Sequence, residues 1–140
     1  MNNKLPNTTT HKSGDNVRIV VFEPSRERFA VVQEVDDPNT AKLPGGSLID
    51  GETVLDGARR ELHEELGNKL KLTADNYAGR LVTDDKKFDR YIFGLIANVA
   101  ELQPSDEIAQ VKWLKISEIP EGKHRQHILS AAELALIHLI

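Results

Sequence analysis

The stretch from Thr53 to Leu66 constrains the fold more than any other part of the sequence, because it has the pattern of an amphipathic helix. Four apolar residues recur there at the three- and four-residue spacing of one helix face: Leu55, Ala58, Leu62 and Leu66. Gly67 supplies a stop signal, and Thr53 with Asp56 resembles a capping box at the start. We therefore expect one helix here, with its apolar face packed against a sheet.

Short runs rich in β-branched and aromatic residues lie on both sides of this helix. They predict strands at residues 17–22, 28–35, 79–83, 87–99 and 109–114. The first two runs read as a hairpin, Pro44–Gly46 reads as a loop, and an apolar-rich segment from about residue 126 to residue 140 predicts a second helix. Strands before and after a central helix, with a second helix at the end, indicate an α/β/α sandwich with a mixed central sheet.

The chain has the size and composition of one domain. It has 140 residues, of which 39% are hydrophobic, and this is enough for a single core and too little for two. Residues 1–15 are polar and almost without apolar side chains, so we expect a flexible N-terminal arm followed by a single domain over residues 16–140.

Composition also narrows the partners. The formal net charge is −4, which argues against binding to a long nucleic acid or to an anionic membrane surface. The chain has no cysteine, and we find no secretory signal or membrane-spanning stretch in it. We expect a cytoplasmic protein with a small-molecule partner, and we leave a homodimer open.

The acidic face of the predicted helix has two readings. Glu61, Glu64 and Glu65 stand at i, i+3 and i+4, and the simple reading is a solvated face on which Arg60 pairs with Glu64, worth about 0.2–0.5 kcal/mol. Against it, like charges lie at i+4 in the half of the helix where the helix dipole disfavours anions. Gly57, costly inside a helix, lies on the same face and would leave room for a ligand. A bound Mg²⁺ would account for both the clustered carboxylates and the glycine, because it takes carboxylate oxygens and completes its coordination shell with phosphate oxygens.

The acidic helix belongs to a longer pattern that starts in the glycine loop. Gly46, five residues, Glu52, seven residues and then the run Arg60-Glu61-Leu62-His63-Glu64-Glu65-Leu66-Gly67 resemble the Nudix box, G-x5-E-x7-R-E-U-x-E-E-x-G-U, where U is a bulky aliphatic residue. Only the last position departs, because Asn68 stands where the pattern has an aliphatic side chain. This departure removes no candidate ligand.

The resemblance implies a Nudix fold and a pyrophosphohydrolase that depends on Mg²⁺, with Mn²⁺ as a substitute. Such an enzyme hydrolyses a nucleoside diphosphate linked to another group by means of a metal-activated water. By the same resemblance, Glu64 and Glu65 would be the main metal ligands, and Glu61 would be a further ligand or the base. The carbonyl of Gly45 would also coordinate the ion.

Three further residues complete the set that the resemblance implies. Glu52 and Arg60 would form an ion pair that braces the loop and serves catalysis. Glu107, six residues before Trp113, is the candidate for an extra acidic metal ligand or base outside the box, with an ordinary solvated loop acid as the equal alternative. We expect Trp113 itself to pack in the core.

Other functions compete with hydrolysis. A non-catalytic Nudix-fold module that senses a nucleotide is the main alternative, but such modules usually lose box glutamates, and Glu61, Glu64 and Glu65 are intact here. A purely structural acidic surface leaves the spacing of Glu52 and Arg60 unexplained. The box does not encode the substrate, so the nucleotide derivative stays open.

Overall fold

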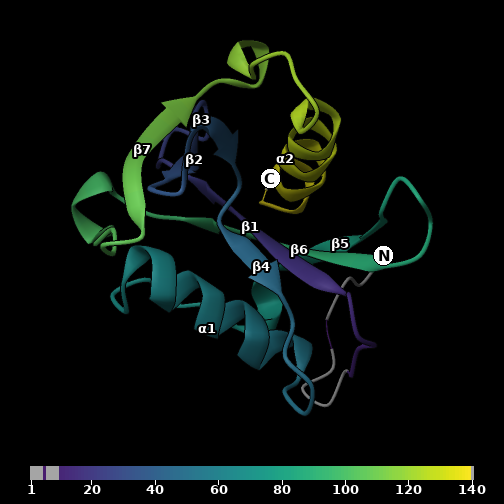
Figure 1. Ribbon diagram of the computed structural model, residues 1–140. Coiled ribbons are helices and arrows are strands. Elements are labelled where there is room, and N and C mark those ends of the chain that lie inside the picture. The colour runs from purple at the N-terminus through teal and green to yellow at the C-terminus, as the bar shows by residue number, and fades with distance from the viewer. Residues whose placement is uncertain (1–4, 6–9, 140) are drawn as a thin grey trace.

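The computed structural model describes residue 5 and residues 10–139 of the chain. In this part, seven strands and two α-helices follow one another: β1 (Asn16–Phe22), β2 (Phe29–Glu34), β3 (Asp37–Lys42), β4 (Gly45–Ser47), α1 (Val54–Leu66), β5 (Tyr77–Val82), β6 (Asp89–Ile96), β7 (Ile108–Leu114) and α2 (Arg125–Leu139). Figure 1 shows α1 and α2 on opposite sides of the strands, so the molecule has three layers. The predicted α/β/α sandwich with a mixed sheet is confirmed.

Two apolar cores lie on the two faces of the sheet, and β1 contributes to both. Ile19 belongs to the core that includes Leu62 of α1, whereas Val20 belongs to the core that includes Ile128 of α2. Successive side chains of a strand point to opposite faces, so the apolar residues 19–22 of β1 serve both cores. Each such side chain contributes roughly 1.5–3 kcal/mol when fully buried. Trp113 packs against the α1 side, as expected.

The sheet is mixed and opens along part of its width. β1 runs parallel to β6, which pairs antiparallel with β5, while β2 pairs antiparallel with β3 and β7. β1 meets β2 at a single residue pair, Phe22 and Phe29, and the first part of β1 pairs with β4 instead. The two halves of the sheet therefore join at the end of β1 and diverge toward its start.

The predicted strands and helices agree with the structure to within a few residues, but two strands were missed. β3 has the sequence DPNTAK, and its Asp, Pro and Asn are uncommon in strands. It forms because β2 offers it a partner, and an outer strand tolerates a proline. Gly45 and Gly46, which we expected in a loop, form β4 through their pairing with β1.

The segment before β1 is attached to the domain where it is described. Residues 1–4 and 6–9 of the predicted arm lie outside the described residues, whereas Leu5 and Asp15 are buried. The Asp15 carboxylate accepts hydrogen bonds from the backbone N–H of Lys12 and of Asp89, both at 2.9 Å. The boundary at residue 16 stays a prediction. None of the helices in residues 10–139 has the length and apolar character needed to span a membrane.

Candidate active site

Helix α1 carries the acidic side chains, and both of its ends are set by the sequence. The Thr53 hydroxyl caps the start by accepting a hydrogen bond from the Asp56 N–H at 3.1 Å. Gly67 ends the helix with a φ of 89°, and its N–H bonds the His63 carbonyl. The apolar face of α1 is buried against the sheet, and the glutamates in the last two turns of the helix lie beside β4.

An ion pair between Glu52 and Arg60 ties the loop before α1 to the helix, as predicted. Arg60 Nη2 lies 2.8 Å from Glu52 Oε1, and Arg60 Nε lies 3.1 Å from Glu52 Oε2, which is a bidentate arrangement. The Ile49 N–H also donates to Glu52, at 2.7 Å. The hydrogen bond from Arg60 is the main reason that the pKa of Glu52 is lowered, and the same contact raises the pKa of Arg60.

The three glutamates of the box do not form a uniform solvated face. The side chain of Glu64 is 55% exposed, that of Glu61 is 14% exposed, and Glu65 is buried between α1 and β4. Arg60 Nη1 lies 3.1 Å from Glu61 and 3.4 Å from Glu64. The Arg60–Glu64 ion pair of the simple reading is thus present. The same guanidinium also forms ion pairs with Glu52 and Glu61, whose side chains are less exposed than that of Glu64.

Glu65 is a buried carboxyl that forms no ion pair with any described residue. Its Oε2 accepts a hydrogen bond from the Gly45 N–H at 2.9 Å. Burial raises its pKa to about 8, the charge of Glu61 acts in the same direction, and the Gly45 N–H opposes them. Burial also raises the pKa of Glu61, against the influence of Arg60. Both carboxylates are therefore costly to ionise until a cation compensates them.

The glycine pair lets β4 approach its neighbours closely. Gly45 has a φ of +140°, and a Cβ there would lie 2.1 Å from the Val17 carbonyl oxygen of β1. A Cβ on Gly46 would lie 2.7 Å from Glu61 Oε1. The absence of both side chains therefore brings the backbone of β4 against the carboxyl groups of α1.

Gly57 has a different role from the one predicted. A Cβ at this position would lie 2.3 Å from Leu48 Cδ2 and 2.8 Å from Glu52 Oε1. The space beside Gly57 is thus filled by two side chains of the protein, and the expectation that it is left for a ligand is wrong. The glycine instead allows Glu52 to lie close to the helix and reach Arg60.

The donor set fits a hard divalent cation in its chemistry. Carboxylates and a backbone carbonyl are the oxygen ligands that Mg²⁺ and Mn²⁺ take, and Glu65 is a buried carboxyl without a counter-ion. In the described part of the chain, however, no three His, Cys, Asp or Glu side chains are gathered as a metal site, and Arg60 is the cation beside Glu61 and Glu64.

Two of the predicted metal ligands, Glu107 and the Gly45 carbonyl, make no contact with the glutamates of the box that would support this role. Glu107 is exposed just before β7, and its carboxylate forms no hydrogen bond or ion pair with the described residues. Gly45 contacts the box through its N–H, which donates to Glu65 Oε2, and not through its carbonyl. Metal binding by Glu107 and by the Gly45 carbonyl therefore stays a prediction.

A small cavity of about 180 Å³ beside the box contains residues that the sequence did not single out. Arg18, Glu34 and Lys42 line it together with Gly45, Gly46 and Glu65. Lys42 Nζ lies 2.6 Å from Glu34 Oε1, whereas Arg18 donates to the Leu43 carbonyl at 2.9 Å. One signal was available in the sequence: Arg18 interrupts the apolar run VRIVVF of a strand that is buried on both faces.

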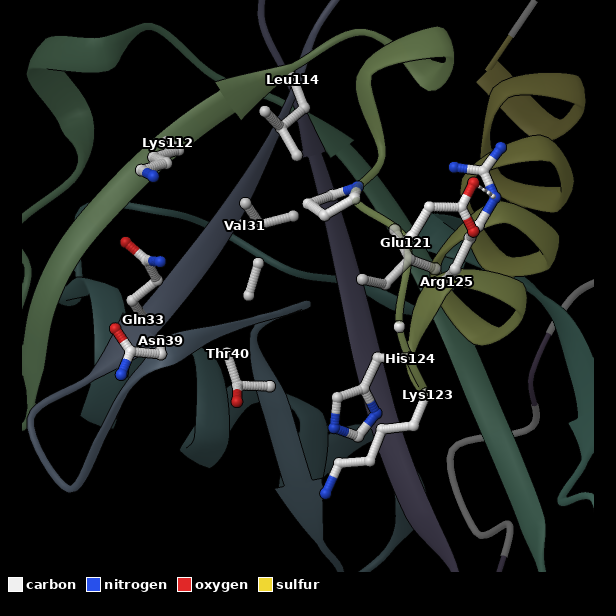
Figure 2. Close-up of a pocket in the computed structure, with 14 residues that line it drawn as sticks. Val31, Gln33, Asn39, Thr40, Lys112, Leu114, Glu121, Lys123, His124 and Arg125 are labelled. Atoms are coloured by element: carbon white, nitrogen blue, oxygen red, sulfur yellow. Dashed lines mark ion pairs between the residues drawn. The ribbon is translucent and has the colours of Figure 1, made fainter.

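A larger groove of about 410 Å³ is lined by Val31, which belongs to the core on the α2 side, so the groove lies on the opposite face of the sheet from α1. Figure 2 shows Gln33, Asn39 and Thr40 along the strands and Lys123 and His124 on the segment before α2. Its charged residues are partly compensated, since Arg125 pairs with Glu121 at 3.8 Å. Arg125 also donates a hydrogen bond to the Ile119 carbonyl.

Comparison with known proteins decides the family. A sequence model of the NUDIX domain matches residues 12–133, which is most of the chain. The chain belongs to the Nudix family. It is 30% identical over 122 residues to Nudix hydrolase 6 of Arabidopsis thaliana, covering 81% of this chain and 42% of that protein. This Nudix chain thus spans less than half the length of that relative.

Two further likenesses show how varied the named functions are. The chain is 28% identical over 93 residues to nucleoside triphosphatase NudI of Escherichia coli, covering 59% of this chain and 66% of that protein. A crystal structure of a UDP-X diphosphatase superposes with a TM-score of 0.71 at 20% identity, covering 96% of this chain and 66% of that one. At this identity the likeness establishes the Nudix fold and leaves the substrate open.

Proposed function

We propose that the chain hydrolyses the pyrophosphate bond of a nucleoside diphosphate linked to another group, and that it needs Mg²⁺, or Mn²⁺ in its place. One observation carries the proposal: the bidentate Glu52–Arg60 pair holds a box of three glutamates against a glycine strand, and one of these glutamates is buried without a counter-ion. A structural acidic surface would not need a buried, uncompensated carboxyl, because water would solvate it more favourably.

Each of the site residues has its own role in this proposal. Glu64 and Glu65 would hold the divalent ion, with Glu61, the Gly45 carbonyl and Glu107 as further ligands. When bound, such an ion would neutralise the charge of the diphosphate and make a water molecule easier to deprotonate.

Glu61 is our candidate for the group that accepts the proton of the attacking water. It lies in a partly buried position, and burial raises its pKa, which makes its carboxylate a better proton acceptor than an exposed glutamate. Arg60 contacts Glu61 and Glu64 while Glu52 orients Arg60 from the loop. Catalysis by this arrangement needs no covalent intermediate, because water is the nucleophile.

The test is a panel of substrates assayed with Mg²⁺ or Mn²⁺. Nucleoside triphosphates, dinucleoside polyphosphates, nucleotide sugars and ADP-ribose are incubated with the protein, and phosphate is measured after treatment with phosphatase. We expect turnover of at least one class, abolished by EDTA and by Glu64→Gln. Glu133→Gln, an exposed change on α2, should leave turnover unchanged.

Two results would contradict the proposal. Full activity of the Glu64→Gln variant, with an unchanged circular dichroism spectrum, would remove Glu64 from the metal site. Nucleotide binding by calorimetry without turnover of any member of the panel would instead favour a non-catalytic sensing module.

A further inference from the structure

A second, strongly cationic pocket lies next to the box. It has a volume of about 300 Å³ and is located where the two halves of the sheet diverge. Four positively charged side chains line it together with one carboxylate, that of Asp37: Arg18, Lys42, Arg90 and Lys123. Lys42 is already paired with Glu34 at 2.6 Å and with Asp37 at 3.8 Å, which leaves Arg18, Arg90 and Lys123 as the charges without an ion pair to a described residue. The chain as a whole has a formal net charge of −4, so this concentration of positive charge is local.

The two arginines of this pocket are held by neutral acceptors. Arg18 Nη1 donates to the Leu43 carbonyl at 2.9 Å, and Arg90 Nε donates to Asn16 Oδ1 at 3.1 Å. Arg90 Nη1 lies 2.9 Å from His127 Nδ1, which accepts from it. Neither guanidinium forms an ion pair with a described residue, although both are partly buried. Their orientation is therefore set without a carboxylate in direct contact, although Glu65 and Glu61 act on Arg18 and Asp84 acts on Arg90 from a greater distance. An anion that binds both guanidiniums would compensate them directly.

Other groups around the pocket add to its preference for an anion. The first turn of α2 borders it through His127, and the N-terminal end of a helix carries a partial positive charge. Burial, followed by the neighbouring Lys123, lowers the pKa of His124, and burial with Arg90 lowers that of His127. Both shifts favour the neutral imidazole form of His124 and His127.

The cationic pocket adjoins the cavity beside the box. Arg18, Lys42 and Leu43 line both this pocket and the small cavity that contains Gly45 and Glu65. The charges of Glu65 and Glu61 also act on Arg18. A group covalently attached to a diphosphate at the box would therefore lie beside residues that also line the cationic pocket.

We propose that the pocket around Arg18 and Arg90 binds an anionic group of the substrate beyond the two phosphates of the cleaved bond. The proposal rests on the proposed function and narrows it to a substrate class. Substrates with three or more phosphates, such as nucleoside triphosphates, are favoured over nucleoside diphosphates esterified to a neutral sugar. The reason is that the two phosphates at the box would already be compensated by the divalent ion, and a neutral sugar leaves the arginines without a counter-ion.

The first test measures binding without metal or turnover. Inorganic tripolyphosphate is titrated calorimetrically into the protein in EDTA, with inorganic pyrophosphate for comparison. We expect tripolyphosphate to bind more tightly than pyrophosphate, and Arg90→Gln to weaken it about tenfold through loss of a charge-assisted contact. The matched control is Arg80→Gln on β5, which removes an equal charge from a side chain that is 58% exposed and outside the pocket. It should change binding less than twofold.

A second variant distinguishes a loss of anion binding from a loss of the folded structure. Arg90 also contacts Asn16 of β1, so its replacement has a structural side that thermal unfolding will report. Lys123 is exposed and lines the same pocket, so Lys123→Gln should keep the fold and weaken tripolyphosphate binding several-fold. Equal binding by wild type, Arg90→Gln and Lys123→Gln would overturn the proposal.

The kinetic test separates this inference from the proposed function. Arg90→Gln should lower kcat/KM for a nucleoside triphosphate about tenfold and for a nucleotide sugar less than twofold, with the same metal present. An equal loss for both substrates would overturn the inference and leave the hydrolase proposal standing. Absence of turnover for every substrate by the wild type would instead contradict the hydrolase proposal, while the metal-free titration would still decide whether the pocket binds a polyphosphate.

Discussion

Replacing Gly57 with alanine tests how the site is built, because propensity and packing predict opposite signs. Inside a helix, alanine is more stable than glycine by about 1 kcal/mol. A surface helix would therefore gain stability from Gly57→Ala. In this protein the added Cβ would lie 2.3 Å from Leu48 Cδ2 and 2.8 Å from Glu52 Oε1.

The size of the stability loss caused by Gly57→Ala follows from these two contacts. Carbon atoms in good contact lie roughly 3.5–4.0 Å apart, so Leu48 must move by more than about 1 Å. Such overpacking costs about 1–3 kcal/mol. Glu52 can yield only by loosening its bonds to Arg60 and to the Ile49 N–H, at about 1.5 kcal/mol or more for a charged hydrogen bond. After subtraction of the helix gain, we expect a net loss of about 2 kcal/mol.

Urea and thermal unfolding in EDTA measure this loss without reference to any activity. A loss of 2 kcal/mol should lower Tm by roughly 4–8 °C for a chain of this size. The Leu48→Ala background removes one of the two contacts, so Gly57→Ala should cost at least about 1 kcal/mol less there. A higher Tm for Gly57→Ala in the wild-type background would refute the reasoning, because it would mean that the helix preference outweighs the contacts of Leu48 and Glu52.

Two further predictions concern backbone strain and pH. Gly45→Ala should lower the free energy of unfolding in urea by more than about 3 kcal/mol, because its Cβ would meet the backbone of β1. The control is Gly122→Ala, which has nearly the same φ but open space around it and should cost about 1 kcal/mol. Equal losses for the two variants would assign the effect to backbone strain alone. For Asp15, burial raises the pKa, but hydrogen bonds from the backbone of Asp89 and of Lys12 outweigh it and leave the pKa lowered. A lowered folded-state pKa adds stability above the unfolded value of 3.8 that is lost as pH falls through the folded value, so Tm should fall more steeply below pH 4 in the wild type than in Asp15→Asn, and parallel curves would contradict this.

Local patterns were sufficient for much of the fold and for the box. The apolar spacing from Leu55 to Leu66 and the cap at Thr53 act within a few residues, so α1 was predictable to within one residue. The Glu52–Arg60 ion pair was predicted as well, from the resemblance of residues 46–68 to the Nudix box. Strands β1, β2, β5, β6 and β7 followed from runs of β-branched residues.

Other features depend on partners that are distant in the sequence. β3 has a poor strand composition and forms because β2 pairs with it, and β4 forms because two glycines allow contact with β1. The function of Gly57 was misjudged because Leu48 fills a space that the helix by itself leaves open.

The sequence by itself determined the family, the box and the helix that carries it, because these depend on spacing along one short segment. Only the tertiary structure decided what surrounds the box. The divergence of β1 from β2 opens a cleft, and parallel pairing of β1 with β6 places Arg18 opposite Ile92 and near Arg90, 72 positions further along the chain. Charges that are unremarkable in separate strands become one anion-binding pocket when the sheet brings them together, since burial removes the water that would otherwise screen them.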